Sequence, residues 1–195
     1  IVDSSLITAY FMSALLAGMY LAVPAIVSII LPDFVPGIDA MNVFLLTTFF
    51  TTIALYFSNY MILCDKRYVL VVAMAGMVLA NIALNYFFIR MGFGILGVSW
   101  ATAVSSFSLL IIFISFSFIY SGEAEKIIPV SFKILLPLVY SMAVFVVLGY
   151  IIKMDNIIID ASLKMVLYTL AFLPLLTVLE RDVKIFELIK RVVFK

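Results

Sequence analysis

Residues 85–104 read NYFFIRMGFGILGVSWATAV, and this stretch decides the fold because it joins two long apolar runs through a very short break. Arg90 ends the first run, where its charge can reach the level of the lipid head groups. Gly92 and Gly94 permit a tight reversal of the chain, and Gly97 permits close approach of the next segment. Small and hydroxyl-bearing residues follow, and these favour close packing of helices in membranes. The stretch therefore predicts a tight helical hairpin whose turn lies at the edge of a membrane.

The composition of the whole chain also points to lipid. Of its 195 residues 67% are hydrophobic and 12% are charged, whereas an average soluble domain carries about 25% charged residues. The single cysteine, Cys64, excludes an internal disulfide, and a chain without histidine lacks the commonest type of zinc ligand. No basic run indicates nucleic acid, and no nucleophile–base pair indicates an enzyme. We expect no metal, no cofactor and no catalytic residue.

Six apolar runs follow one another along the chain, each close to or longer than the roughly 20 residues that a helix needs to cross a bilayer. They cover residues 6–31, 38–64, 68–89, 95–120, 132–152 and 157–179. Backbone groups cannot stay unpaired in hydrocarbon, so each run is predicted to be a helix. The alternating segments of about ten residues that a transmembrane barrel requires are not found. We therefore predict an all-α, polytopic membrane bundle of six transmembrane helices over residues 1–180.

The distribution of lysine and arginine predicts the orientation of the six spans. Of the 12 such residues, nine fall in the C-terminal tail and the set of breaks on its side, and three, Arg90, Lys153 and Lys164, fall on the other side. By the positive-inside rule both ends of the chain face the cytoplasm, and we predict a multi-pass protein of the cytoplasmic (plasma) membrane. Residues 181–195 have apolar residues at helical spacing and are predicted to form a cytoplasmic amphipathic helix. It would anchor to the leaflet, pack beneath the bundle or recruit a partner.

Neutral polar residues enter the spans, whereas no charged residue lies near the centre of one. The second span places Thr48, Thr52, Tyr56 and Asn59 on one helical face, at spacings of four, four and three. Further candidates lie in the third and fourth spans: Asn81, Asn85, Ser99 and Thr102. Such side chains either bond neighbouring helices together or line a watery cavity that accepts a polar head group. The length of the second-span stripe favours the cavity there.

Three quoted segments together resemble a known family. They are LANIALNYFFIRMGFGILGVSWATAVSSF (79–107), IVSIILPDFVPGIDAMNVFLLTTFF (26–50) and CDKRY (64–68). The first combines an asparagine-containing helix, a short outer turn and a helix that opens with Ala-Thr. In this order the segments resemble the polysaccharide flippases of the O-antigen translocase type, within the multidrug/oligosaccharidyl-lipid/polysaccharide exporter superfamily. The similarity extends over roughly residues 5–120, and the remainder agrees only in topology.

The resemblance implies two six-helix bundles around a central cavity, with the substrate site near their interface. The six spans would be the last six of a fourteen-helix protein, which agrees with a chain that begins with Ile1 and has no signal peptide. The implied activity is the flipping of lipid-linked oligosaccharide or polysaccharide precursors by alternating access. The implied partners are the lipid bilayer, the lipid-linked glycan and the missing N-terminal half of the same chain. The cationic cavity residues of the family have no central match here.

Two other functions stay open at this stage. One is a multidrug/toxin cation antiporter of the same superfamily. The coupling site of such an antiporter favours an acidic residue deep in a span, and none of the six predicted spans contains one near its centre. The other is a non-transporting membrane scaffold for glycosyltransferases that acts through its tail. Deletion of residues 183–195 separates a scaffold, which would lose its partners, from a flippase, which would keep moving its substrate.

Overall fold

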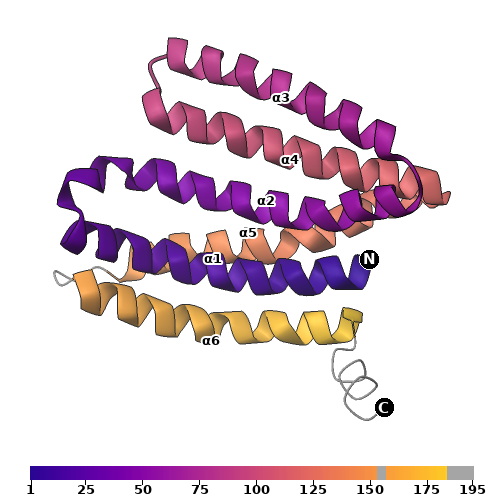
Figure 1. Ribbon diagram of the computed structural model, residues 1–195. Coiled ribbons are helices and arrows are strands. Elements are labelled where there is room, and N and C mark those ends of the chain that lie inside the picture. The colour runs from indigo at the N-terminus through magenta and orange to yellow at the C-terminus, as the bar shows by residue number, and fades with distance from the viewer. Residues whose placement is uncertain (153–156, 184–195) are drawn as a thin grey trace. The chain divides into compact units, whose positions relative to one another are not determined.

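The computed structural model describes residues 1–152 and 157–183, and these residues form helices and short turns without any strand (Figure 1). Six α-helices and two short 3-10 helices follow one another in the order α1 (Val2–Ile30), η1 (Pro32–Gly37), α2 (Ile38–Leu63), α3 (Arg67–Arg90), α4 (Gly94–Ser121), η2 (Ala124–Lys126), α5 (Ile127–Ile151) and α6 (Ile157–Val183).

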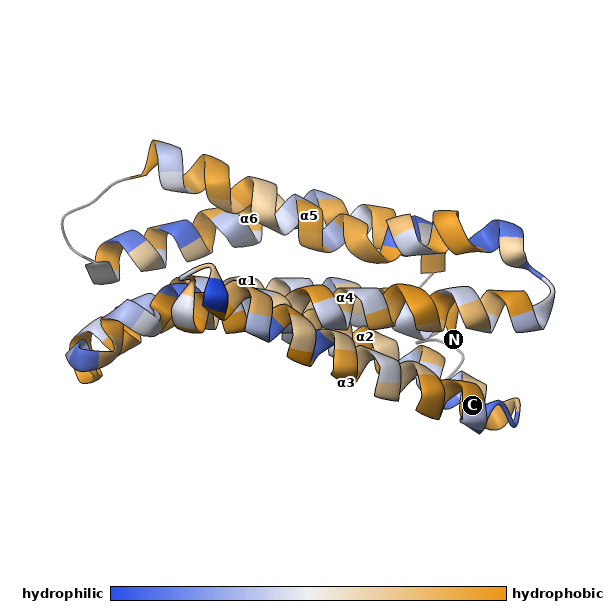
Figure 2. Ribbon diagram, turned by 90° about the horizontal axis from the view of Figure 1, so that it is seen from above, coloured by the Kyte–Doolittle hydropathy of each residue, from blue (hydrophilic) through white to orange (hydrophobic). Residues whose placement is uncertain are grey.

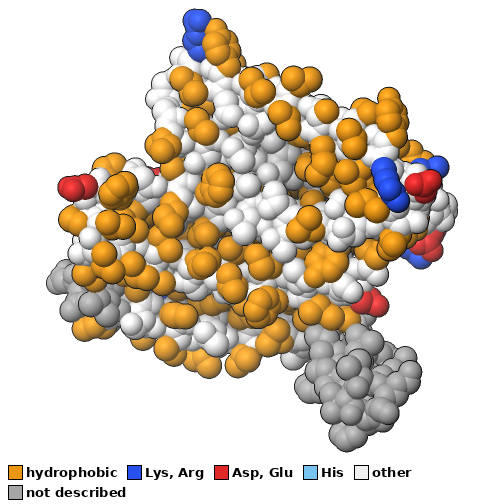
Figure 3. All heavy atoms as spheres, in the orientation of Figure 1, with side chains coloured by type: hydrophobic (Ala, Val, Ile, Leu, Met, Phe, Trp, Pro, Cys, Tyr) orange, Lys and Arg blue, Asp and Glu red, His pale blue; other side chains and the backbone are white. Residues whose placement is uncertain are grey.

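All six α-helices are long and apolar enough to cross a membrane. This confirms the predicted all-α class, and six helices of this length and composition suggest a multi-pass membrane protein. Figure 2 shows hydrophobic residues along every helix, and on the face in Figure 3 hydrophobic side chains cover the helices while charged ones gather at their ends. Of the predicted amphipathic tail, residues 181–183 continue α6, and residues 184–195 lie outside the described part of the chain.

Two helices begin earlier than the apolar runs predicted. The first begins at Val2 and not at residue 6, and the fifth begins at Ile127 and not at residue 132. A helix is continued by backbone hydrogen bonds and not by apolar character, so α1 includes the polar residues Asp3, Ser4 and Ser5. Pro129 is tolerated because it lies in the first turn of α5, where backbone N–H groups have no helical acceptor.

Backbone hydrogen bonds close the turn between α2 and α3, since the N–H of Cys64 donates to Tyr60 O and that of Lys66 donates to Met61 O. Asp65 adopts the left-handed conformation with φ of 56°, and its carboxylate lies 3.7 Å from Arg67. Lys66 places its ammonium 4.9 Å from the centre of the Tyr120 ring, at the end of α4. Such a cation–π contact joins the α2–α3 turn to the neighbouring end of α4.

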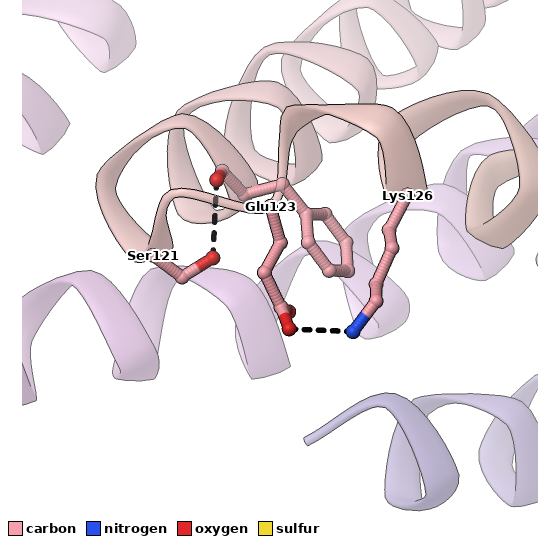
Figure 4. Close-up of polar contacts among 4 residues, drawn as sticks. Ser121, Glu123 and Lys126 are labelled. Carbon is pink, nitrogen blue, oxygen red and sulfur yellow. Dashed lines mark hydrogen bonds and ion pairs between the residues drawn. The ribbon is translucent and has the colours of Figure 1, made fainter.

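A glycine ends α4 and reverses the chain toward α5. Gly122 has φ of 76°, and the N–H of Glu123 donates to the carbonyl of Phe118, as in the common glycine cap of helices. Figure 4 shows the polar contacts of this turn: Ser121 Oγ donates to Phe118 O at 3.0 Å, and Lys126 Nζ donates to Glu123 Oε1 at 2.5 Å.

The chain forms two compact units. The first consists of residues 26–131 together with Ile1 and contains α2, α3 and α4. In it α4 packs along both α2 and α3, while α2 and α3 touch each other only slightly. Its core is aromatic and aliphatic, with Phe49, Phe57 and Phe113 fully buried, whereas no residue of α3 is buried.

The second unit contains residues 2–25 of α1, α5 from Phe132 onward, and α6. Aromatic rings join its three helices, since Tyr20 lies 5.1 Å from Phe145, and Phe145 stacks on Tyr168 at 5.0 Å between ring centres. Gly18 faces Met165, which would lie 3.6 Å from an added Cβ. Within this unit, α1 therefore contacts both α5 and α6.

Candidate functional site

The polar stripe of α2 lies on the side of the helix away from its aromatic packing face. Thr48 and Asn59 are exposed, and Thr52 and Tyr56 are half-buried. The hydroxyl of Thr48 donates to the carbonyl of Phe44, one turn earlier in the same helix, at 3.3 Å. A threonine hydroxyl that donates in this way can still accept hydrogen bonds from another molecule.

The depth of this stripe matters because the helix is long enough to cross the bilayer. The 26 residues of α2 span about 39 Å at 1.5 Å per residue, against a hydrocarbon core of roughly 30 Å. On this scale Thr48 and Thr52 lie within about 4 Å of the helix midpoint, and Asn59 lies about 13 Å from it. The exposed hydroxyl and amide groups therefore fall at hydrocarbon depth, where polar groups face water or other polar groups.

The two asparagines of α3 join this helix to α4. Asn81 Nδ2 donates to Ser105 Oγ at 3.2 Å, and Asn85 Nδ2 donates to Asn81 Oδ1 at 2.9 Å. Both asparagines are half-buried, and Asn85 Oδ1 has no hydrogen-bond partner among the described residues. The geometry thus agrees with the first of the two interpretations, in which the polar groups hold helices together.

The two candidates of α4 bond to their own helix. Ser99 is buried and donates to the carbonyl of Ile95 at 3.3 Å, and Thr102 is half-buried and donates to that of Val98 at 2.9 Å. Donation to the carbonyl four residues earlier is a common way for Ser and Thr to satisfy their hydroxyl inside a helix.

The hairpin residues occupy the turn between α3 and α4. Arg90 is the last residue of α3, with its guanidinium carbon 5.0 Å from the centre of the Tyr86 ring. Gly92 and Gly94 have φ of 85° and 55°, a conformation that glycine adopts without steric penalty. A Cβ on Gly97 would lie 2.8 Å from the Cβ atom of Phe88, a residue of α3. The first two glycines thus serve the reversal, and the third serves the close approach of α4 to α3.

Ser105, which accepts the hydrogen bond from Asn81, was not among the residues predicted from the sequence. Asn81 lies 12 positions before Phe93, and Ser105 lies 12 positions after it. In a tight antiparallel hairpin, residues equidistant from the turn lie at the same level, so this symmetry was a usable signal. Phe88, five positions before Phe93, and Gly97, four positions after it, also lie at nearly the same level.

An ion pair in α6 was also not among the candidates. Lys164 Nζ lies 2.5 Å from Asp160 Oδ2, and the two side chains are 17% and 19% exposed. With 27 residues in α6, Lys164 lies about 9 Å from the helix midpoint and therefore within the hydrocarbon depth. Spacing of four residues between opposite charges was the available signal.

The chain matches no protein-family model, no curated protein and no solved structure. Its likeness to the polysaccharide flippases therefore stays a prediction from the three sequence segments quoted above.

Proposed function

We propose that this chain is the C-terminal part of a membrane transporter that flips lipid-linked oligosaccharide or polysaccharide precursors across the cytoplasmic membrane by alternating access. The observation that supports this proposal best is the exposed neutral polar stripe of α2. Its members Thr48 and Thr52 lie near the middle of a membrane-crossing helix and not at its ends.

The chemistry of the stripe suits a glycan. Sugar hydroxyls both donate and accept hydrogen bonds, and Thr and Asn side chains can do the same without a fixed charge. Several weak, exchangeable hydrogen bonds let a polar head group cross without a tightly bound intermediate. The lipid tail of the substrate would remain in the bilayer, beside the apolar faces of the helices.

The hairpin supports the proposal from the sequence side. The segment 79–107, on which the resemblance depends, contains the asparagine pair, the glycine turn and the opening Ala-Thr of α4. In the proposal, α5 and α6 are the two additional C-terminal helices of a fourteen-helix flippase, and the N-terminal bundle supplies the opposite wall of the pathway. Alternating access then occurs by movement of one bundle relative to the other.

Complementation tests this proposal in cells that lack the full-length gene. The full-length protein with Thr48→Val and Thr52→Val should reduce surface glycan roughly five- to tenfold, with accumulation of the lipid-linked precursor, because each lost hydrogen bond is worth about 0.5–1.5 kcal/mol. The matched control is Thr169→Val, which removes an exposed hydroxyl that bonds within α6 to Met165 O.

The double variant and its control must be compared at equal amounts of protein in the membrane. Wild-type glycan levels in the double variant would contradict the role of the stripe. Deletion of the gene without any change in surface glycan or precursor would contradict the flippase itself.

A further inference from the structure

Helices α2 and α4 of the first compact unit run in the same direction. Near the middle of both helices, Phe50 lies 5.3 Å from Phe107 between ring centres. Just beyond α2, Lys66 lies 4.9 Å from the centre of the Tyr120 ring, near the end of α4. Because middle faces middle and end lies near end, the two helices are parallel, and their starts also lie at one level (Figure 1).

The turns before α2 and α4 lie together at one end of this unit and expose apolar side chains. These turns are residues 31–37 and 91–93. Five of their side chains are apolar and between 42% and 66% exposed: Leu31, Phe34, Val35, Met91 and Phe93. We call these five residues the apolar tips. An exposed cluster of this kind favours an apolar partner.

The turns after α2 and α4, residues 64–66 and 122–126, lie at the opposite end and expose charge. Four charged side chains are exposed there: Asp65, Lys66, Glu125 and Lys126. The positive-inside rule concerns lysine and arginine, and acidic residues contribute little to it. It therefore accounts neither for the exposed carboxylates at this end nor for the exposed phenyl rings at the other.

The short helix η1 separates its one charge from its apolar side chains. Residues three apart eclipse each other in a 3-10 helix, and the N–H of Phe34 donates to the carbonyl of Leu31 at 2.9 Å. Leu31 and Phe34 therefore share one face of this turn, whereas Asp33 shares a different face with Pro36. A turn built in this way can keep its carboxylate among polar head groups while its phenyl ring enters an apolar layer.

The turn between α3 and α4 contains no charged side chain. Phe93 packs edge-on against Phe88 of α3, with 5.9 Å between ring centres, and still exposes about half of its surface. The neighbouring charge belongs to Arg90, whose guanidinium lies 5.0 Å from the centre of the Tyr86 ring, one turn earlier in α3. This charge is therefore held beside α3, and the turn itself presents Met91 and Phe93.

The lengths of the helices place both ends of the unit near the edge of the hydrocarbon. Helices α2, α3 and α4 have 26, 24 and 28 residues, or about 36–42 Å, against roughly 30 Å of hydrocarbon and 40–45 Å with the head groups. If the unit were centred in the bilayer, its ends would lie about 3–6 Å beyond the hydrocarbon. Apolar side chains are more stable among acyl chains, and charged side chains are less stable there. A displacement of about 3–6 Å toward the charged end therefore favours both.

We propose that the apolar tips insert at the acyl boundary of one lipid leaflet, with Phe34 and Phe93 among the lipids, and that the turns at the charged end project into water. Irregular backbone exposed to lipid is not tolerated within the hydrocarbon, so the tips lie at its boundary and no deeper. This inference depends on the chain crossing a membrane and not on the transported molecule. It can therefore be tested without substrate.

Spin labels on single cysteines of the full-length protein measure the depth of each turn, in nanodiscs of phosphatidylcholine and phosphatidylglycerol. Oxygen concentrates among acyl chains, whereas a nickel chelate stays in water, so the collision rates of a label with the two reagents report its depth. We expect oxygen to dominate at Val35 and Met91, and nickel to dominate at Cys64 and Ala124, two exposed positions in the turns at the charged end. If nickel reached Val35 and Met91 as readily as Cys64, the proposal would be overturned. Shielding of Val35 and Met91 from both reagents would also overturn it, because protein and not lipid would then cover the tips.

Substitution of the exposed ring tests what holds the turn at this depth. In Phe34→Ser the label at Val35 should become more accessible to nickel, and in Phe34→Leu, which keeps an apolar side chain, it should change less. The control is Tyr68→Ser, at a position that is 81% exposed in the first turn of α3 at the charged end, and it should leave the depth of Val35 unchanged. An unchanged depth in Phe34→Ser, or an equal change in the control, would show that the ring does not anchor the turn.

Discussion

Asn81 Nδ2 lies 3.2 Å from Ser105 Oγ, and this bond joins α3 to α4 at the level where the sequence is symmetric about the turn. Because no residue of α3 is buried, polar bonds and close packing at a few points hold this helix. The bond therefore contributes a larger share of the attachment of α3 than a similar bond would in a buried helix.

Replacement of Asn81 by alanine should loosen α3. It removes the bond to Ser105 and also the acceptor of Asn85, and interhelical hydrogen bonds in membrane proteins contribute about 0.6 kcal/mol on average and at most about 1.7 kcal/mol. We expect a loss of about 1 kcal/mol, measured by denaturation in mixed micelles. Ser108→Ala is the control, since the Ser108 hydroxyl bonds only within α4 to Val104 O. Equal losses in the two variants would exclude a special role for the asparagine.

Gly97 and Gly76 make a matched pair for alanine substitution. An added Cβ at Gly97 would meet the Cβ atoms of Phe88 and Phe93 at 2.8 Å, whereas nothing lies within 4 Å of one at Gly76. A Cβ atom moves only with its backbone, so Gly97→Ala must push α3 and α4 apart, at about 1–3 kcal/mol. Gly76→Ala should be neutral or stabilise by up to about 1 kcal/mol through helix propensity. Thermal unfolding in detergent measures both, and a stable Gly97→Ala would contradict the close approach.

The backbone conformation of Gly92 predicts which substitutions at this position lower stability most. Its φ of 85° is unfavourable for residues with a Cβ, by roughly 1–2 kcal/mol. Gly92→Ala should therefore lower the melting temperature, and Gly92→Asn should lower it less, because asparagine adopts this conformation more readily than most residues. The reverse rank, with alanine better tolerated than asparagine, would show that the turn is not built this way.

Two lysine–carboxylate ion pairs have the same N–O distance but differ in the exposure of their side chains. The Lys164–Asp160 side chains are 17% and 19% exposed, and the Lys126–Glu123 side chains are 51% and 44% exposed. Asp160→Asn leaves a mostly buried ammonium without this carboxylate, and breaking a buried pair can cost about 3–5 kcal/mol. Glu123→Gln should change stability by less than about 1 kcal/mol. Mixed-micelle denaturation of the two variants compares them directly, and similar losses would show that exposure does not govern these pairs.

The six helices could be predicted from the sequence because length and apolar character alone define a membrane span. The helix starts differ from the starts of the apolar runs at α1, whose first turn contains Asp3, Ser4 and Ser5, and at α5, whose apolar first turn contains Pro129. The orientation in the membrane and the choice of membrane stay predictions. The division into two compact units was not predicted, since apolar runs carry no information on which helices pack together.

The candidate site was predictable only in part, for a related reason. A stripe such as that of α2 follows from helical spacing, but the exposure of Thr48 and the half-burial of Thr52 depend on how α2 is turned against α4. The bond from Asn81 to Ser105 required knowledge of the hairpin register. The bonds of Tyr140 and Ser141 of α5 to residues of α6 depend on the relative shift of the two helices, which the sequence does not give.

The peripheral position of α3 has a consequence for how the chain is made. Helix α2 packs mainly on α4, and α3 separates them in the sequence. Synthesis proceeds at about 5–20 residues per second, so α2 leaves the ribosome several seconds before α4, its main packing partner. During that interval the packing face of α2 has no partner, since Phe50 later contacts Phe107 of α4 with 5.3 Å between ring centres, so this face is available to a chaperone or insertase.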